Sequence, residues 1–186
     1  MSRILCIDPG AHGAFAVFDT TGRTLNIIDM PVWHAIVGRR KRPRIDGIEL
    51  ADLFDLWSDS VDLVVMEQIS PHKRMWGSKS TLYTQGYHVG LIYMAAIQMR
   101  MPLETIHSHT WKRIMRVPND AQGICKRFQE LFPSHRDAVI GPRGAWRHDR
   151  AEAAMLAAYG ADNMLRNVLP GQDWRIKTTR EAETGG

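Results

Sequence analysis

Residues 3–19 read RILCIDPGAHGAFAVFD and contain two apolar runs separated by a glycine-rich turn. The first run, at 4–7, has the length of a buried strand, and it stops at Asp8 and a Pro-Gly turn. Residues 14–19 and 24–30 form two further strand-like segments joined by short turns. The sequence therefore predicts an antiparallel meander of three strands, with Asp8 at the C-terminal end of the first.

Beyond the meander, helical and strand patterns alternate along the chain. Asp46 is a favourable N-cap for a helix with one apolar face. A continuous apolar run at 63–66 predicts a strand covered on both faces, and Glu67 follows it directly. The other predicted elements are helices at about 82–100, 111–115, 121–132 and 149–165, a strand at 103–106, and basic loops at 37–44 and 71–79.

This order predicts an α/β fold, a five-stranded mixed sheet with helices on both faces. The antiparallel three-strand meander is joined by two parallel strands, which is the ribonuclease H-like arrangement. At 186 residues the chain has the length of one domain. We place that domain at residues 1–168 and expect a polar, disordered tail at 169–186.

Composition indicates the class of partner and the compartment. The chain has 24 Lys and Arg against 20 Asp and Glu, a net charge of +4, which favours an anionic partner. No apolar run approaches the roughly 20 residues of a membrane span, and the polar start lacks the apolar core of a signal peptide. We therefore expect a cytoplasmic protein without membrane contact, in which Cys6 and Cys125 are reduced core thiols.

Four acidic residues stand where a phosphodiester-cleaving site would need them. Asp8 and Glu67 end two apolar strands, while Asp149 and Glu152 lie three apart, on one face of a predicted helix. Mg²⁺ prefers such hard oxygen ligands, and two divalent ions are a common device for phosphodiester hydrolysis. We predict that these four acids are catalytic and bind two Mg²⁺ ions, with Mn²⁺ as an alternative. Each acid alone also fits a turn or a helix start, but that interpretation explains the set of four poorly.

Two basic segments are candidates for DNA binding, because phosphate contacts dominate the affinity of proteins for DNA. The alternative for both is a solvated loop. An aromatic residue among the cations of the second segment could stack on an unpaired base. The candidate residues are Arg39, Arg40, Lys41, Arg42 and Arg44 in the first segment, and Lys73, Arg74, Trp76 and Lys79 in the second.

Four segments together resemble the RuvC family of Holliday junction resolvases, especially its shorter phage and bacterial forms. They are DPGAHGAFAVFD, VVMEQIS, HTWKR and HDRAEAAMLAAYG, and the resemblance covers residues 3–165. It implies a homodimeric, Mg²⁺-dependent endonuclease that cuts four-way DNA junctions by paired symmetric nicks. The four acids match the family's metal-binding positions, although the last is usually Asp and is Glu152 here. The family also often carries an aromatic residue shortly after the Glu-Gln pair, where this chain has Ile69 and Ser70.

Two further residues become candidates through this resemblance. Lys112 matches a basic residue near the family's catalytic centre and could stabilise charge on the reacting phosphate, or be an ordinary surface lysine. Some relatives carry His where Asp149 stands, so His148 could bind a metal, contact the phosphate, or simply begin the helix.

Three questions stay open from the sequence. A stripe of apolar residues in the helix at 82–100 is either core or a dimer interface. A different ribonuclease H-like nuclease, acting on forks, other branched DNA or RNA/DNA hybrids, would share the four acids. A non-catalytic junction-binding protein would keep the basic segments without needing the acids. The stripe comprises Tyr83, Tyr87, Gly90, Leu91 and Met94.

Overall fold

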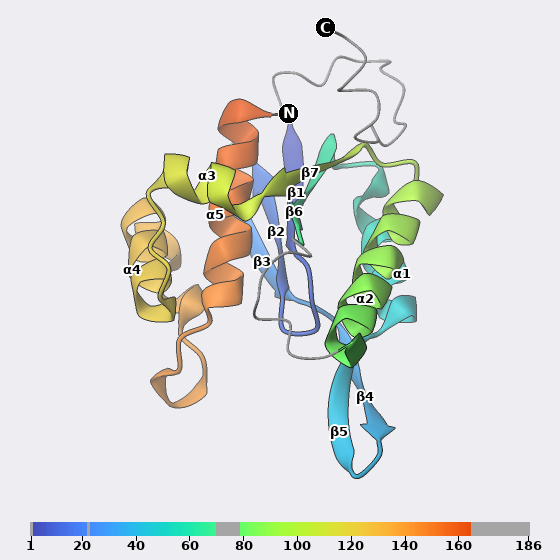
Figure 1. Cartoon of the computed structure of the whole chain (residues 1–186). Helices are drawn as coiled ribbons and strands as arrows, with labels where there is room; N and C mark the ends of the chain where they lie inside the picture. The colour runs from blue at the N-terminus through green and yellow to red at the C-terminus, as the bar shows by residue number, and fades with distance from the viewer. Residues whose placement is uncertain (1, 22, 70–78, 165–186) are drawn as a thin grey trace, which may run out of the picture.

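The computed structural model describes residues 2–21, 23–69 and 79–164 and has a five-stranded mixed sheet at its centre (Figure 1). The central strand β1 pairs antiparallel with β2 and parallel with β6, while β3 and β7 form the two edges. The predicted fold class is confirmed, meander and parallel strands included. In spatial order the strands are β3 (Thr24–Asp29), β2 (Ala14–Asp19), β1 (Arg3–Asp8), β6 (Leu63–Gln68) and β7 (Leu103–His107).

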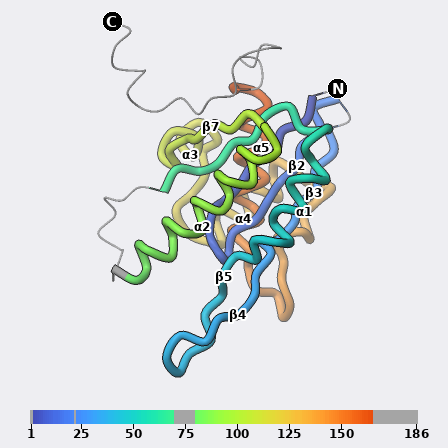
Figure 2. Tube along the Cα trace, turned by 90° about the vertical axis from the view of Figure 1, so that its right-hand side faces the viewer, coloured from blue at the N-terminus to red at the C-terminus, as the bar shows by residue number. Residues whose placement is uncertain are grey.

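Helices cover both faces of the sheet, as Figures 1 and 2 show from two directions. One face carries α1 (Gly47–Ser58) and α2 (Lys79–Gln98). The other carries α5 (His148–Asn163), with α3 (Ser108–Met115) and α4 (Ala121–Leu131) beside it. Two 3₁₀ segments, η1 (Pro133–Val139) and η2 (Pro142–Gly144), connect α4 to α5.

The core has two halves, because alternate residues of a strand point to opposite faces of the sheet. Ile4 and Cys6 of β1 pack in the half that contains α5, whereas Leu5 and Ile7 pack in the half that contains α1 and α2. Cys6 and Cys125 are both buried and free, as predicted.

The alanine-rich α5 lies unusually close to the sheet. A Cβ atom at Gly160 would lie 2.5 Å from Cδ1 of Ile4, so the helix can approach β1 this closely only with glycine at that position. Ala153, Ala154 and Ala157 are also fully buried. Close contact at the C-terminal half of α5 fixes the direction in which its N-terminal half runs past the strand ends.

The predicted basic loop at 37–44 is wrong, because these residues belong to a β-hairpin. Strands β4 (Val32–Val37) and β5 (Arg40–Ile45) form a separate two-stranded sheet that protrudes from the body (Figures 1 and 2). Gly38 has φ +62° and occupies the first position of the two-residue turn, where glycine is favoured. High charge and Pro43 argued against a strand, yet proline is tolerated where a strand lies at an edge.

Part of the predicted organisation falls outside the described residues. This applies to the tail at 169–186 and to Lys73, Arg74 and Trp76, while Lys79 begins α2. Within the described ranges, no helix has both the length and the apolar character needed to cross a membrane.

Candidate active site

The parallel pairing of β1 and β6 brings two of the predicted acids to the same edge of the sheet. Ile7 pairs with Met66 at the end of the ladder, so the next residues, Asp8 and Glu67, lie side by side. Both strands run in the same direction, and both side chains therefore emerge at the C-terminal edge. A shift in this register would separate the two carboxylates.

The first turns of α5 bring the other two acids to this edge. Burial raises the pKa of Asp8 well above its ordinary value, and the negative charges of Glu152, Glu67 and Asp149 raise it further. Among the residues that the structure describes, only the Lys112 ammonium opposes this shift. The structure thus gathers the four predicted acids, together with Lys112, around the end of β1. We refer to Asp8, Glu67, Asp149 and Glu152 as the acid cluster.

Helix α3 supplies hydrogen-bond partners to two members of the cluster. The ammonium of Lys112 lies 2.6 Å from Oε1 of Glu152, and both side chains are largely buried. The indole Nε1 of Trp111 donates to Oε2 of Glu67 at 3.0 Å, and this indole is fully buried. Trp111 was missed at the sequence level, although it precedes Lys112 in the HTWKR segment.

His148 is the first residue of α5, and its Nε2 lies 3.4 Å from Oδ1 of Asp149. This contact is an ion pair only when the imidazole is protonated. Its side chain is exposed, so the ring is accessible at the rim of the acid cluster.

A second group of charges, also missed at the sequence level, holds the start of α5 against β3. The guanidinium of Arg150 donates from Nε and NH2 to the two carboxylate oxygens of Asp29, at 2.6 and 2.7 Å. NH2 of Arg147 lies 3.0 Å from Oδ2 of the same carboxylate, and Arg150 also donates to the carbonyl of Ala138. The hydrogen bond from Arg150, with the nearby positive charges, lowers the pKa of Asp29. Arg150 stands between Asp149 and Glu152 in the sequence, so this contact positions both acids.

The turn after Asp8 is held by a close backbone approach. A Cβ atom at position 13 would lie 1.9 Å from the carbonyl oxygen of Asp8, so only glycine fits there without movement of the backbone. Gly13 also donates to the carbonyl of Gly10 and accepts from Met30. The position of Asp8 therefore depends on Gly13.

The donor set of the cluster fits a divalent metal in its chemistry. Carboxylate oxygens are the ligands that Mg²⁺ prefers. The pKa of Asp8 is raised by burial and by three nearby carboxylates, whose negative charge a cation would offset. Within the described ranges, however, no three Asp, Glu, His or Cys side chains are already placed to enclose one ion. The ion pair of Lys112 with Glu152 and the hydrogen bond of Trp111 to Glu67 hold two of the carboxylates instead.

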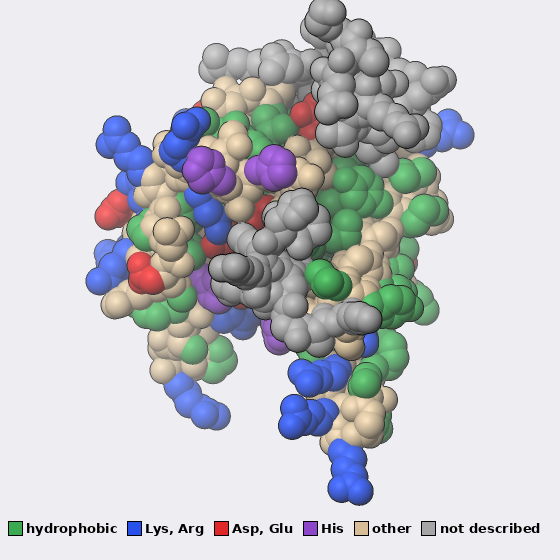
Figure 3. Space-filling model, viewed as in Figure 1, with side chains coloured by type: hydrophobic (Ala, Val, Ile, Leu, Met, Phe, Trp, Pro, Cys, Tyr) green, Lys and Arg blue, Asp and Glu red, His purple; other side chains and the backbone are tan. Residues whose placement is uncertain are grey.

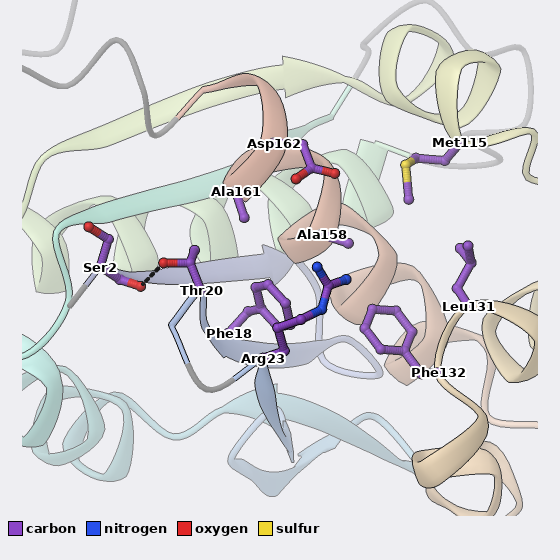
Figure 4. Close-up of a pocket in the computed structure, with 10 residues that line it drawn as sticks. All are labelled: Ser2, Phe18, Thr20, Arg23, Met115, Leu131, Phe132, Ala158, Ala161 and Asp162. Carbon is purple, nitrogen blue, oxygen red and sulfur yellow. Dashed lines mark hydrogen bonds between the residues drawn. The ribbon is translucent and has the colours of Figure 1, made fainter.

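A cavity of about 430 Å³ lies elsewhere, at the opposite end of α5, where the helix faces the start of β1 and the end of β2 (Figure 4). No member of the acid cluster lines it. Its lining mixes apolar side chains with a few polar groups, and it is not part of the candidate site. The lining residues are Ser2, Phe18, Thr20, Arg23, Met115, Leu131, Phe132, Ala158, Ala161 and Asp162.

Comparison with solved structures shows the fold again. RuvC of T. thermophilus, solved in complex with a Holliday junction substrate, matches with a TM-score of 0.53 at 12% identity, covering 87% of this chain and 96% of that one. The yeast mitochondrial Holliday junction resolvase Ydc2 matches with a TM-score of 0.51 at 14% identity, covering 89% and 81%. No family model and no curated protein sequence matches the chain. At such low identity these likenesses show a RuvC-like, ribonuclease H-like fold.

Proposed function

We propose that the chain is a metal-dependent endonuclease that resolves four-way DNA junctions by paired symmetric nicks. The observation that carries this proposal is the acid cluster, in which burial and the carboxylates of β6 and α5 raise the pKa of Asp8 at the end of β1. Four carboxylates gathered with one ammonium cost folding free energy unless they serve a bound cation. The RuvC-like fold supports the same activity, because both solved neighbours are junction proteins.

In this proposal Asp8, Glu67, Asp149 and Glu152 hold two Mg²⁺ ions, and Mn²⁺ would also suit their oxygen ligands. When bound, such ions supply an activated water and stabilise the leaving oxygen of the phosphodiester. Asp8 lies centrally, since the other three carboxylates all act on it.

The neighbouring side chains position these ligands and balance their charge. Trp111 holds one oxygen of Glu67 by a hydrogen bond and so orients this carboxylate. Lys112 neutralises Glu152 in the metal-free protein and carries a positive charge beside the place where the phosphate would sit. In this proposal the exposed imidazole of His148 contacts the phosphate at the rim of the acid cluster.

The DNA partner is assigned from charge and from the neighbouring fold. Arg39, Arg40, Lys41, Arg42 and Arg44 lie on the hairpin, and Lys and Arg side chains gather at its end in Figure 3. Lys73, Arg74, Trp76 and Lys79 directly follow the strand that carries Glu67 and remain proposed contacts from chain connectivity. We propose the single nuclease domain at 1–168 as the unit that carries all of these functions.

The test is a cleavage assay of the purified protein on strand-labelled DNA. Matched four-way junction, fork, linear duplex and RNA/DNA hybrid substrates are incubated with Mg²⁺, Mn²⁺ or EDTA. We expect paired nicks at symmetric positions on opposite strands of the junction, with either metal and not in EDTA. Asp8→Asn should abolish them, whereas Glu104→Gln, a carboxylate-to-amide change on the exposed side of β7, should not.

Other outcomes separate the alternatives. Preferred cleavage of forks or hybrids would assign the chain to another ribonuclease H-like nuclease. Tight junction binding without cleavage under any metal would support the non-catalytic junction-binding protein.

A further inference from the structure

The hairpin sorts its basic residues onto different faces. Directly paired residues of an antiparallel ladder point to the same face, and successive residues along a strand alternate. Arg44 pairs with Trp33, Arg42 with Ala35 and Arg40 with Val37. The three arginines therefore share one face, which we call the arginine face.

The opposite face of the hairpin has a different character. Lys41 pairs there with Ile36, and Pro43 pairs with His34, so a single cation stands among apolar and aromatic side chains. Arg39 lies in the turn, between the two strands. A segment that is uniformly basic in sequence is thus divided in the structure. Three arginines lie on one face, one lysine lies on the other, and Arg39 lies in the turn at the tip of the hairpin.

The base of the hairpin is fixed to the body. Ile45 is buried in the core, and the guanidinium of Arg44 donates to the hydroxyl of Thr84 on α2. The arginine face is therefore turned toward α2 at its base, while Arg40 and Arg42 are exposed.

The hairpin also starts at the edge of the sheet that carries the acid cluster. Asp8 pairs with Ala14, and Ala14 pairs with Asp29, so these residues form one row across the sheet. Strand β4 begins three residues after Asp29. Six residues of strand span about 20 Å, so the hairpin is an arm of that length extending from the candidate active-site edge.

We infer that the arginine face of the hairpin binds the phosphate backbone of a duplex arm of the DNA whose scissile bond lies at the acid cluster. This inference rests on the proposed function for the identity of the ligand. Arginines two residues apart on a strand are separated by about 7 Å, so each can reach a different phosphate. The guanidinium group is suited to bidentate phosphate contacts, and a two-stranded ribbon has the dimensions of a DNA groove.

Two charge-matched double variants test this face assignment. Arg40→Gln/Arg42→Gln removes two positive charges from the arginine face, and Arg39→Gln/Lys41→Gln removes two from the tip and the opposite face. Both lower the net charge equally, so any difference between them reports local contact rather than long-range attraction. All four residues are exposed, and thermal melting should confirm that both variants fold like the wild type.

Binding is measured by fluorescence anisotropy with a labelled four-way junction in EDTA, across a series of KCl concentrations. The arginine-face variant should bind about tenfold more weakly, and its slope of log K against log salt should fall by about 2, roughly one for each lost phosphate contact. The control variant should change that slope by less than half as much. Equal losses in the two variants, or a larger loss in the control, would overturn the inference.

The cleavage assay separates this inference from the proposed function. If the wild type cuts junctions and the two variants bind alike, only the face assignment fails. If the wild type binds junctions without cutting, the comparison of variants still decides the face assignment, while the nuclease proposal fails. A wild type that neither binds nor cuts DNA refutes both.

Discussion

At the scale of single residues, Asp8 is the residue on which the unfavourable charge interactions of the candidate site act. Its carboxyl is held at the end of β1 by the register with β6 and by the close approach of Gly13. Burial and three neighbouring carboxylates oppose its ionisation, and Lys112 only partly compensates. The backbone therefore holds this carboxyl where ionisation is unfavourable in the metal-free protein. A strongly perturbed pKa of this kind marks a candidate functional site.

Asp8→Asn should raise the melting temperature of the metal-free protein, because it removes a charge that burial and like charges destabilise. With the folded pKa raised above 3.8, the ionised carboxyl destabilises the fold at neutral pH, and this cost disappears as the pH falls toward 3.8. In a domain of this size, a change of 1 kcal/mol in the free energy of unfolding shifts the melting temperature by about 2–4 °C. We expect a gain of a few degrees in EDTA at pH 7.5 that shrinks at pH 5, measured by calorimetry.

Glu104→Gln provides the matched control for that comparison, since Glu104 is exposed on β7 and should shift the melting temperature little. An Asp8→Asn protein that melts below the wild type in EDTA would contradict the crowded-carboxylate description of the site.

At the scale of elements, the position of α5 depends on contacts at both of its ends. Gly160 allows the C-terminal half to lie against Ile4, and the Asp29–Arg150 pair holds the first turn to the end of β3. Asp149 and Glu152 flank Arg150, so the placement of two cluster acids relies on this pair. Asp29 also lies shortly before the hairpin in the chain. This one residue therefore connects the hairpin to the start of α5.

Asp29→Asn should reduce cleavage more than it reduces stability. The pair is partly exposed, so its loss should cost about 1 kcal/mol, whereas a small displacement of α5 would misplace two of the four carboxylates. The folded pKa of Asp29 lies below 3.8, so its stabilisation is present above that pH and is lost as the pH falls through the folded value. The melting-temperature difference from wild type should therefore persist from pH 5 to 8 and narrow below pH 4.

Glu130→Gln is the matched control, because it breaks the exposed Arg127–Glu130 ion pair on α4 by the same carboxylate-to-amide change. Cleavage rate and melting temperature are measured for both variants. Equal rates for Asp29→Asn and Glu130→Gln would show that the Asp29–Arg150 pair has no positioning role.

At the scale of the whole molecule, α2 presents an apolar stripe to solvent. The side chains of Tyr83, Tyr87 and Met94 are 74%, 47% and 59% exposed, and a Cβ at Gly90 would meet no atom within 4 Å. Leu91 packs partly against the core, but the other members of the stripe do not, and the alternative of a dimer interface remains for them. We propose that α2 packs against the same helix of a second copy, since such a self-complementary contact closes a twofold dimer and supplies one active site for each cut strand.

Met94→Glu should shift the protein from dimer to monomer in sedimentation equilibrium at tens of micromolar, because it places a charge in the apolar stripe. Leu56→Glu is the matched control, since Leu56 is 72% exposed on α1, outside the stripe. A wild-type monomer, or equal effects of the two substitutions, would exclude this interface. Loss of paired nicks with retention of single nicks in Met94→Glu would link the dimer to junction resolution.

The sequence by itself determined the elements of the sheet, most of the helices and the order of the four acids. Apolar runs that stop at Asp8 and at Glu67, and the alanine-rich segment around Glu152, are local patterns whose periods reflect backbone geometry. The hairpin was not predicted, because its turn signal, the glycine in Val-Gly-Arg-Arg, lies within a charged run that is typical of a loop.

Only the tertiary structure decided which side chains meet. The register of β1 with β6 places Asp8 beside Glu67. The packing of α3 brings Trp111 and Lys112 to the acid cluster. Arg150 binds Asp29, which is 121 residues away in the chain. The two faces of the hairpin likewise follow from its pairing register. Such contacts depend on how elements pack at long range, which no local periodicity encodes, so the chemistry of the site was visible in the sequence while its supporting partners were not.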